Sequence, residues 1–289
     1  MPDAEKPKTV LVTGASSGIG RALAFHLDSL GFAVFASVRN ERDAEDLCSQ
    51  SGAHLMPVLM DVTDPESILH ARAQIMRTVG ENALFALVNN AGIGFTGPLE
   101  FMPLEDFRWM FAVNVFGLLA VTQAFLPLIR QAKGRIVNIS STAALITAPF
   151  HGTYTAAKLS VKGISDALRL ELQPHGVQVA LVYCGNVKTL IWKKRSETSN
   201  QIRARQPEEA KRVYGEQHLQ IEKYFEYMGR SGLPPEVAAR MIARALTAKR
   251  AKQTYYVGPD AQLYRFFNKV VHGRLHDWVI VRFMGFLGS

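Results

Sequence analysis

Two side chains in the middle of the chain are suited to proton transfer. Tyr154 and Lys158 stand four residues apart in a stretch with helical periodicity, so the ammonium lies one turn from the phenol on the same helix face. A free tyrosine has a pKa near ~10, too high for a good base at neutral pH, and a nearby positive charge favours the phenolate. The spacing therefore allows general acid–base chemistry, although such a pair taken alone is more typical of an ordinary helix surface.

A glycine-rich turn near the N-terminus is suited to binding phosphate. Residues 13–20 read TGASSGIG and stand between an apolar, strand-like run and a helical pattern. At such a junction the glycines let the backbone approach a pyrophosphate, and the first amides of the helix point at its oxygens. The spacing alone also fits a tight turn, but the strand before it and the helix after it favour a dinucleotide site. The residues expected to line that site are Gly14, Ser16, Ser17, Gly18, Ile19 and Gly20.

The end of the second strand-like run bears on which dinucleotide binds. NAD sites usually place an acidic residue there, where it accepts hydrogen bonds from the ribose hydroxyls. Residues 37–40 read SVRN, with no carboxylate. Arg39 can form charge-assisted hydrogen bonds with a 2′-phosphate and stack on adenine, although a solvated loop cation is the plainer interpretation. The sequence therefore favours NADP(H), with NAD(H) as the alternative.

The hydrophobic pattern predicts the scaffold that must position these residues. Short apolar runs rich in β-branched residues alternate with longer helical patterns, which is typical of a parallel sheet flanked by helices. We predict an α/β fold with a single doubly wound Rossmann-type domain over residues 1–260. The predicted strands cover residues 9–13, 33–38, 54–59, 84–88, 135–140, 177–183 and 254–257, and the predicted helices cover residues 18–30, 41–50, 64–79, 104–131, 151–172 and 235–247.

Residues 8–260 resemble the short-chain dehydrogenase/reductase family, because five of its motifs occur in the family's order. The motifs are the glycine turn with Gly14, Gly18 and Gly20, the run Asn89-Asn90-Ala91-Gly92, then Asn114, Ser141 and the Tyr154–Lys158 pair. The resemblance implies an NADP(H)-dependent oxidoreductase that transfers hydride between nicotinamide and a carbonyl or secondary alcohol. A non-catalytic NADP(H)-binding redox sensor is the alternative, but it need not retain the serine, tyrosine and lysine together.

The family also implies a role for each matching residue. Tyr154 would donate the proton in reduction, Ser141 would hydrogen-bond the substrate oxygen, and Lys158 would hold the ribose and lower the tyrosine pKa. Asn114 would kink its helix and hold a water joined to Lys158, and no metal is required. The implied cofactor contacts include the glycine turn, Tyr154 and Lys158. The further contacts are Asp61 and Val62 at the adenine, Asn90, Ala91 and Gly92 along the dinucleotide, and Gly185, Val187 and Thr189 at the nicotinamide. Beside Gly185, Cys184 replaces the family's usual proline.

Three further segments look like the branch of the family that contains steroid and retinol dehydrogenases. They are residues 87–92 (LVNNAG), 121–128 (VTQAFLPL) and 165–172 (SDALRLEL), and they imply a bulky, apolar carbonyl or alcohol substrate. The polar residues 188–229 form an insertion that either closes over the substrate as a lid or packs as an ordinary pair of surface helices. The apolar side chains available for a lid are Leu190, Ile191, Trp192, Tyr224, Phe225, Tyr227 and Met228.

The charge of the chain is concentrated in its C-terminal part. The 289 residues are 48% hydrophobic and 20% charged, which excludes a disordered protein, and their net charge is +8. Residues 249–289 supply +5 of this, with seven basic and two acidic residues. The sequence contains no recognisable nucleic-acid-binding module, so no nucleic-acid partner is expected. The extension 261–289 is expected to pack as a helix with a solvated face, with peripheral membrane contact or a cover over the active site as alternatives.

Cysteine content and the N-terminus bear on location. Cys48 and Cys184 are too few for a disulfide scaffold or a zinc site, and the first residues lack the apolar stretch of a signal peptide, so we expect a cytoplasmic protein, with membrane association as the alternative. Residues 109–129 are uncharged and long enough to span a bilayer, but interrupting polar residues favour a buried helix. The family pairs subunits through helices that here begin near Leu104 and His151, which implies a homodimer or homotetramer.

Overall fold

A parallel sheet forms the centre of the molecule. The computed structural model describes residues 7–80 and 83–283, so part of the predicted domain 1–260 and the last six residues of the predicted extension lie outside the described residues. Within those ranges the strands are β1 (Thr9–Val12), β2 (Ala33–Val38), β3 (Leu55–Leu59), β4 (Ala86–Asn89), β5 (Arg135–Ser141), β6 (Gln178–Cys184) and β7 (Thr254–Val257). They form one seven-stranded parallel sheet in the order β3-β2-β1-β4-β5-β6-β7.

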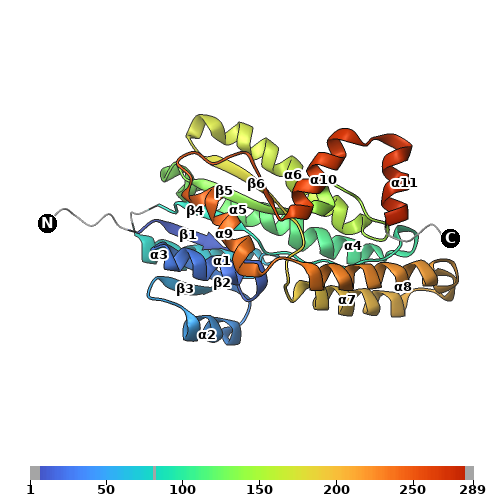
Figure 1. The fold of residues 1–289 in the computed structure, drawn as a ribbon. Helices are drawn as coiled ribbons and strands as arrows, with labels where there is room; N and C mark the ends of the chain where they lie inside the picture. The colour runs from blue at the N-terminus through green and yellow to red at the C-terminus, as the bar shows by residue number, and fades with distance from the viewer. Residues whose placement is uncertain (1–6, 81–82, 284–289) are drawn as a thin grey trace.

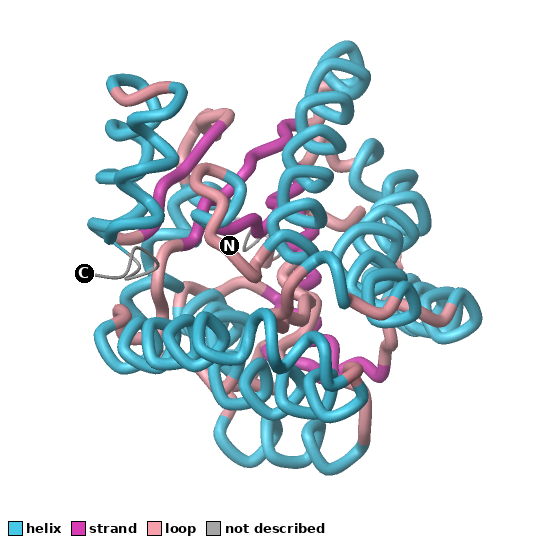
Figure 2. Tube along the Cα trace, turned by 90° about the vertical axis from the view of Figure 1, so that its right-hand side faces the viewer, coloured by secondary structure: helices cyan, strands magenta, loops and turns pink. Residues whose placement is uncertain are grey.

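Helices cover both faces of this sheet, as Figure 2 shows. They are α1 (Gly18–Ser29), α2 (Glu41–Gln50), α3 (Pro65–Val79), α4 (Leu104–Phe111), α5 (Leu118–Gln131), α6 (Gly152–Leu172), α7 (Ile191–Arg205), α8 (Glu208–Ser231), α9 (Pro235–Thr247), α10 (Pro259–Val270) and α11 (Gly273–Phe283). The predicted doubly wound α/β fold is confirmed.

Strand β1 shows how alternate side chains of one strand enter the two core layers, one on each face of the sheet. Val10 and Val12 belong to the core cluster on the face covered by α1 and α9, whereas Leu11 belongs to the cluster on the face covered by α3, α5 and α6. Successive side chains of a strand point to opposite faces, so a strand covered on both sides must be apolar throughout. All four residues of β1 are buried accordingly.

The helix predicted over residues 104–131 is interrupted. Between α4 and α5 the residues Ala112–Gly117 form a π-helical segment, which an apolar periodicity does not reveal. The run Leu104–Gln131 has the length and apolarity of a membrane span, but half of its most apolar window is buried inside the fold. It packs against β4, α3 and α6, as expected for a core helix.

The insertion and the C-terminal extension are both helical. In Figure 1, α7 and α8 lie side by side as a hairpin that extends beyond the sheet, and α10 and α11 stand on the other side of the same end. Phe267 and Ile280 from the extension join a core cluster with Ile221 and Phe225 of α8. The extension is therefore packed, as expected, while its outer side exposes Leu263, Phe266, Val270, Leu275 and Trp278.

Arg135 ties the start of β5 to the end of α9. Its buried guanidinium donates hydrogen bonds to the backbone carbonyls of residues 245, 246, 248 and 249. The last carbonyls of a helix have no partner within the helix, so this side chain satisfies groups that would otherwise be buried without hydrogen bonds.

Replacing Arg135 by methionine is expected to lower the free energy of unfolding by about 2–3 kcal/mol, because several buried carbonyls lose their donors. The matched variant Arg77→Met, at an exposed position of α3, is expected to change it by less than about 0.5 kcal/mol. Urea denaturation of both variants measures the difference. Equal losses in the two variants would contradict this role of Arg135.

Candidate active site

The predicted site residues meet at the carboxyl ends of the strands. The strand order reverses between β1 and β4, where ligands of doubly wound folds bind. One cavity at this edge is lined by Gly14, Ser16, Ser17, Gly18, Ile19, Arg39, Asp61, Val62, Asn90, Ala91, Gly92, Asn114, Ser141, Tyr154, Lys158, Gly185, Val187 and Thr189. Gly20 differs from the prediction, since it does not line the cavity. A Cβ at Gly20 would collide with the carbonyl of Gly14 and the amide of Asn90, so it permits close packing behind the turn.

The glycine turn is shaped by the absence of side chains. Gly14 and Gly18 have φ angles of +65° and +60°, in the left-handed region that favours glycine. A Cβ at Gly14 would lie 2.8 Å from Cα of Ala91, and one at Gly18 would lie 3.0 Å from Cβ of Thr189. The turn therefore offers bare backbone to the cavity, which fits a pyrophosphate at the start of α1.

The end of the cavity near β2 and β3 is suited to a phosphate-bearing ribose. Arg39 is exposed at the end of β2, lines the cavity and forms no ion pair within the described chain. The carboxylate of Asp61 accepts hydrogen bonds from the backbone N–H of Thr63 at 2.8 Å and from its hydroxyl at 2.7 Å. A free guanidinium therefore stands where NAD sites usually hold a carboxylate, while Asp61 caps its own turn.

Tyr154 lies at the inner end of the cavity beside Ser141 and Lys158. The hydroxyl of Ser141, at the end of β5, is hydrogen-bonded to the phenol. Lys158 Nζ lies 5.6 Å from the centre of the Tyr154 ring and donates to the carbonyl of Ile139 at 3.1 Å. Ser140 is buried and donates instead to the carbonyl of Lys158, so Ser141 is the serine of this pair that reaches the phenol.

Burial is the largest cause of the pKa shifts of Tyr154 and Lys158. Desolvation raises the pKa of Tyr154 to about 12, although the hydrogen bond with Ser141 opposes it. Desolvation also lowers the pKa of Lys158 to about 8. In the protein alone the pKa of Tyr154 is therefore raised, and the lowering expected from Lys158 together with a bound cofactor stays a prediction. A further positive charge in the cavity would favour the phenolate.

Asn114 lies in the π-helical segment and leaves one polar atom without a partner. Its Nδ2 donates to the carbonyls of Ile93 and Met110, both at 3.0 Å. Its Oδ1 is buried and accepts no hydrogen bond within the described chain. A Cβ on Gly92 would lie 2.7 Å from this oxygen and 3.5 Å from Lys158 Nζ, so amide and lysine face the same small space. An unused buried acceptor fits a bound water between them.

The loop after β6 is held by a residue that sequence reasoning missed. The Asp260 carboxylate occupies the space that a Cβ on Gly185 would need and accepts a hydrogen bond from the backbone N–H of Asn186 at 2.7 Å. This contact fixes the loop that the family's proline usually stiffens. Burial raises the pKa of Cys184 to about 12, which keeps its thiol un-ionised and unsuited to redox chemistry.

The outer half of the cavity is largely aromatic. Of the apolar side chains expected in the insertion, Leu190 and Tyr227 are exposed and do not line the cavity. The ones that do line it are Ile191, Trp192, Tyr224, Phe225 and Met228. Lining residues that sequence reasoning missed include Trp109, Ile146, His151, Arg195 and Tyr264.

His151 could have been found from its position three residues before Tyr154, which places both on one side of the first turn of α6. Its imidazole stacks on the phenol ring, with the ring centres 4.7 Å apart and the planes 15° from parallel. Burial lowers the pKa of His151 to about 3, and the nearby Arg195 charge adds to this shift. The imidazole beside Tyr154 is therefore neutral at physiological pH.

Comparison with known proteins identifies the family. The family model for short chain dehydrogenases matches residues 8–200. The chain belongs to the short-chain dehydrogenase family.

Relatives of this dehydrogenase include steroid and retinol dehydrogenases, the branch predicted from its sequence. It is 34% identical over 277 residues to an NADPH-dependent 3-dehydrocapnine reductase of Ornithobacterium rhinotracheale, covering 94% of this chain and 95% of the relative. It is 36% identical to 17-beta-hydroxysteroid dehydrogenase type 6 of Bos taurus, covering 95% and 88%, and 35% identical to retinol dehydrogenase 5 of Mus musculus, covering 94% and 89%.

Solved structures share the fold of this dehydrogenase. A short-chain dehydrogenase from Streptomyces avermitilis aligns with a TM-score of 0.75 at 26% identity, covering 96% of this chain and 98% of the other. A short chain dehydrogenase/reductase from Burkholderia phymatum, solved in complex with NAD, aligns with a TM-score of 0.77 at 26% identity, covering 91% and 94%.

The lowered pKa of His151 has a consequence for stability at acidic pH. Below about pH 6.5 the unfolded chain protonates this imidazole while the folded protein does not until about pH 3, so the free energy of unfolding falls as the pH falls through this window. Relative to His151→Gln, the wild type is expected to lose about 2 kcal/mol between pH 7.5 and 4.5. Urea denaturation at both pH values measures it. The exposed-site variant His175→Gln should keep the wild-type dependence, and parallel behaviour of wild type and His151→Gln would contradict the burial argument.

Proposed function

We propose that this short-chain dehydrogenase interconverts a ketone or aldehyde and the corresponding alcohol, and that its substrate is bulky and apolar. The observation that carries the proposal is the position of Tyr154, hydrogen-bonded to Ser141 and close to Lys158, where the glycine-turn half of the cavity meets its aromatic half. The steroid and retinol dehydrogenases among its relatives support the substrate class.

The preferred cofactor is NADP(H), with NAD(H) as the alternative. The free guanidinium of Arg39 and the lack of a carboxylate at the end of β2 favour a 2′-phosphate, and one relative is named as NADPH-dependent. NAD(H) stays the alternative because a similar solved structure holds NAD. The glycine turn would hold the pyrophosphate, and Lys158 would hold the nicotinamide ribose. When bound, the cofactor supplies or accepts the hydride.

The chain's own residues handle the proton and the substrate oxygen. In reduction, Tyr154 donates its phenolic proton to the oxygen that becomes the alcohol, and the raised pKa keeps that proton in place beforehand. Ser141 holds the same oxygen by a hydrogen bond as negative charge develops on it. Asn114 accepts from a water beside Lys158, which returns a proton toward the tyrosine. In the oxidative direction, Tyr154 accepts the alcohol proton.

The hairpin of α7 and α8 closes the substrate end of the site. Trp192 of α7 and Phe225 of α8 line the cavity, and Tyr264 of the extension adds a third aromatic wall. Large rings of this kind bury apolar substrate surface and exclude water from the reacting atoms. We propose that residues 188–229 act as a substrate lid on the domain 1–260, and that residues 261–283 of the extension support this lid through the contacts of Phe267 and Ile280 with α8.

We also propose a location for the protein in the cell. We place it in the cytoplasm, with peripheral membrane contact through the outer side of α10 and α11. Leu263, Phe266 and Trp278 are exposed there, close in sequence to the basic residues Arg265 and Arg274. An apolar strip flanked by cations is typical of helices that lie on an anionic bilayer surface.

Replacing Tyr154 by phenylalanine tests the catalytic proposal. The variant keeps the ring but removes the transferable proton, so turnover of NADPH with ketones, retinoids or steroids is expected to fall by a factor of at least about 10² while NADPH binding is kept. Absorbance at 340 nm measures turnover and calorimetry measures binding. Wild-type activity in the variant would overturn the mechanism. Tight NADPH binding by a wild type that turns over no substrate of the panel would favour a redox sensor.

We further propose a homodimer or homotetramer that buries the exposed apolar side chains of Phe116 and Leu170. Light scattering is expected to give at least twice the 32.0 kDa mass of the chain, and Phe116→Glu is expected to lower that mass because it places a charge in the interface. Leu69→Glu, at another exposed apolar position on α3, should leave the mass unchanged. A 32.0 kDa particle at working concentration would contradict the assembly.

A further inference from the structure

A buried arginine lines the substrate half of the cavity. The side chain of Arg195, on α7, is only 5% exposed, although it forms part of the cavity wall. Its guanidinium lies 4.1 Å from the centre of the Phe225 ring and 5.8 Å from that of Trp192. Both rings line the same cavity, so a permanent positive charge stands among the side chains expected to hold an apolar substrate.

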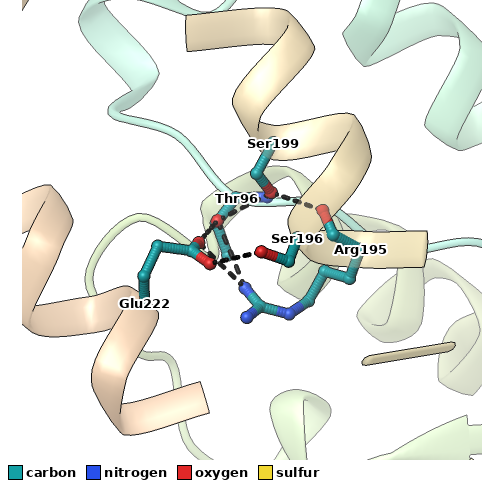
Figure 3. Close-up of polar contacts among 5 residues, drawn as sticks. All are labelled: Thr96, Arg195, Ser196, Ser199 and Glu222. Carbon is teal, nitrogen blue, oxygen red and sulfur yellow. Dashed lines mark hydrogen bonds and ion pairs between the residues drawn. The ribbon is translucent and has the colours of Figure 1, made fainter. Parts of the chain in front are cut away.

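The hydrogen-bonding capacity of this guanidinium is largely unused. A guanidinium has five N–H donors. Nη1 of Arg195 donates to the hydroxyl of Thr96 at 3.3 Å and to Glu222 Oε1 at 3.4 Å, and both distances are long. Nε is buried without a partner, and no hydrogen bond is made by Nη2 within the described chain. Figure 3 shows that all contacts of the drawn cluster reach the guanidinium from the Nη1 side.

Glu222 holds the arginine but is itself satisfied mainly by hydroxyls. The Thr96 hydroxyl lies 3.0 Å from Glu222 Oε1, and the Ser196 hydroxyl donates to Oε2 at 3.2 Å. Both contacts are shorter than the ion pair with Arg195, as the cluster in Figure 3 shows. The carboxylate therefore fixes the guanidinium from one side and leaves its other donors for a further partner.

The charged side chains that line the substrate half of the cavity are positive, whereas the carboxylates of Glu222, Glu226 and Asp260 act on this wall from behind it. Lys194 lies beside Arg195 in the sequence, is exposed and also lines the cavity. Glu222 does not line it, and the acidic residue that does, Asp61, lies at the end near β3. An anion entering this half would therefore meet two cations and no carboxylate on the wall, which favours its binding.

The arginine stands at a defined position relative to the reacting group. The His151 ring stacks on Tyr154, and the centre of the Phe225 ring lies 4.9 Å from that of His151. The guanidinium of Arg195 lies against the other end of this row, beside Phe225. Two rings of the cavity wall thus separate the guanidinium from the phenol, so the two polar groups stand at opposite ends of an aromatic row.

We propose that Arg195, with Lys194, binds an anionic group of the substrate. The inference rests on the proposed function and narrows its substrate class. The substrate is then an amphiphile whose carbonyl or alcohol reaches Tyr154, whose apolar body lies on the aromatic wall, and whose carboxylate, sulfonate or phosphate pairs with the free donors of Arg195. Arg195 is a specificity-determining residue in this arrangement, and Glu222 orients it.

Matched ketones that differ only in an anionic group test the proposal. Estrone is compared with estrone 3-sulfate, and a long-chain methyl ketone with the same ketone ending in a sulfonate. One charge-assisted hydrogen bond is worth about 1.5–3 kcal/mol, so kcat/KM is expected to be about 10- to 100-fold higher for the anionic member of at least one pair, mainly through KM. Equal kcat/KM values within both pairs would overturn the proposal.

The double variant Arg195→Gln/Glu222→Gln removes both charges together and so avoids leaving one buried and unpaired. It is expected to lose the preference for the anionic ketone, so that the ratio of kcat/KM for the anionic over the neutral ketone falls to about 1. Lys193→Gln is the matched control, because Lys193 is an exposed cation two residues before Arg195 on the same helix and does not line the cavity. This control should behave as the wild type.

The single variant Glu222→Gln separates anion binding from a purely structural ion pair. If Arg195 binds an anion, removing the competing carboxylate preserves or increases the preference for the anionic ketone. A fall of this preference to about 1 in Glu222→Gln would overturn the proposal, because Arg195 would then keep its charge without favouring the anionic ketone. A change in the KM for NADPH rather than for the ketone would overturn it as well, since the cations would then serve the cofactor.

Calorimetry of estrone 3-sulfate and the sulfonated ketone distinguishes failure of this inference from failure of the proposed function. Binding that is lost in the double variant supports the anion site even if no ketone is turned over, in which case the proposed reaction fails alone. Turnover of the neutral ketones without any gain in affinity from the sulfate or sulfonate overturns the anion site and leaves the proposed reaction standing.

Discussion

The close approach of the ends of β1 and β4 is the constraint on which the site depends. The Thr13 hydroxyl accepts hydrogen bonds from the backbone N–H groups of Asn90 and Ala91, both at 2.9 Å, and the Asn90 amide donates to the carbonyls of Thr13 and Gly14. These contacts bring the glycine turn against the loop after β4 so tightly that Gly14 and Gly20 have no space for a Cβ. The crevice that receives a dinucleotide is what remains open in front of this junction.

The tight packing at this junction continues toward Tyr154. Gly92 follows the junction, and the space beside its Cα is occupied by Asn114 Oδ1 and Lys158 Nζ. The π-helical segment puts Asn114 there, and α6 carries Lys158 together with Tyr154. Desolvation is the largest cause of the pKa shifts of Tyr154 and Lys158, so the protein alone keeps the tyrosine protonated.

The strands and the motif residues of this arrangement could be predicted from local sequence pattern, whereas contacts between distant elements could not. The runs at residues 33–38 and 254–257 become strands with the predicted bounds, because a β-branched run between turn residues has few other solutions. The stacking of His151 on Tyr154 is local, and the spacing of three residues could have revealed it. The contact of Asp260 with Gly185 joins residues far apart in the chain, and the π-helical segment is not visible in an apolar periodicity. Periodicity carries no record of such contacts, whereas family motifs record only those that every member shares.

Helix α7 buries polar side chains that its sequence pattern would leave in solvent, and this burial points to a role for them. Its sequence is polar enough to lie fully in solvent, yet Arg195 and Ser199 are among its buried residues. Burying a charge and hydroxyls costs free energy that apolar side chains at the same positions would not cost. The hydroxyls of Thr96 and Ser196 recover part of that cost at Glu222, but Nε of Arg195 stays without a partner. The anion that we propose at Arg195 would offset part of this cost, because it supplies a negative charge beside a guanidinium that is incompletely hydrogen-bonded in the free protein.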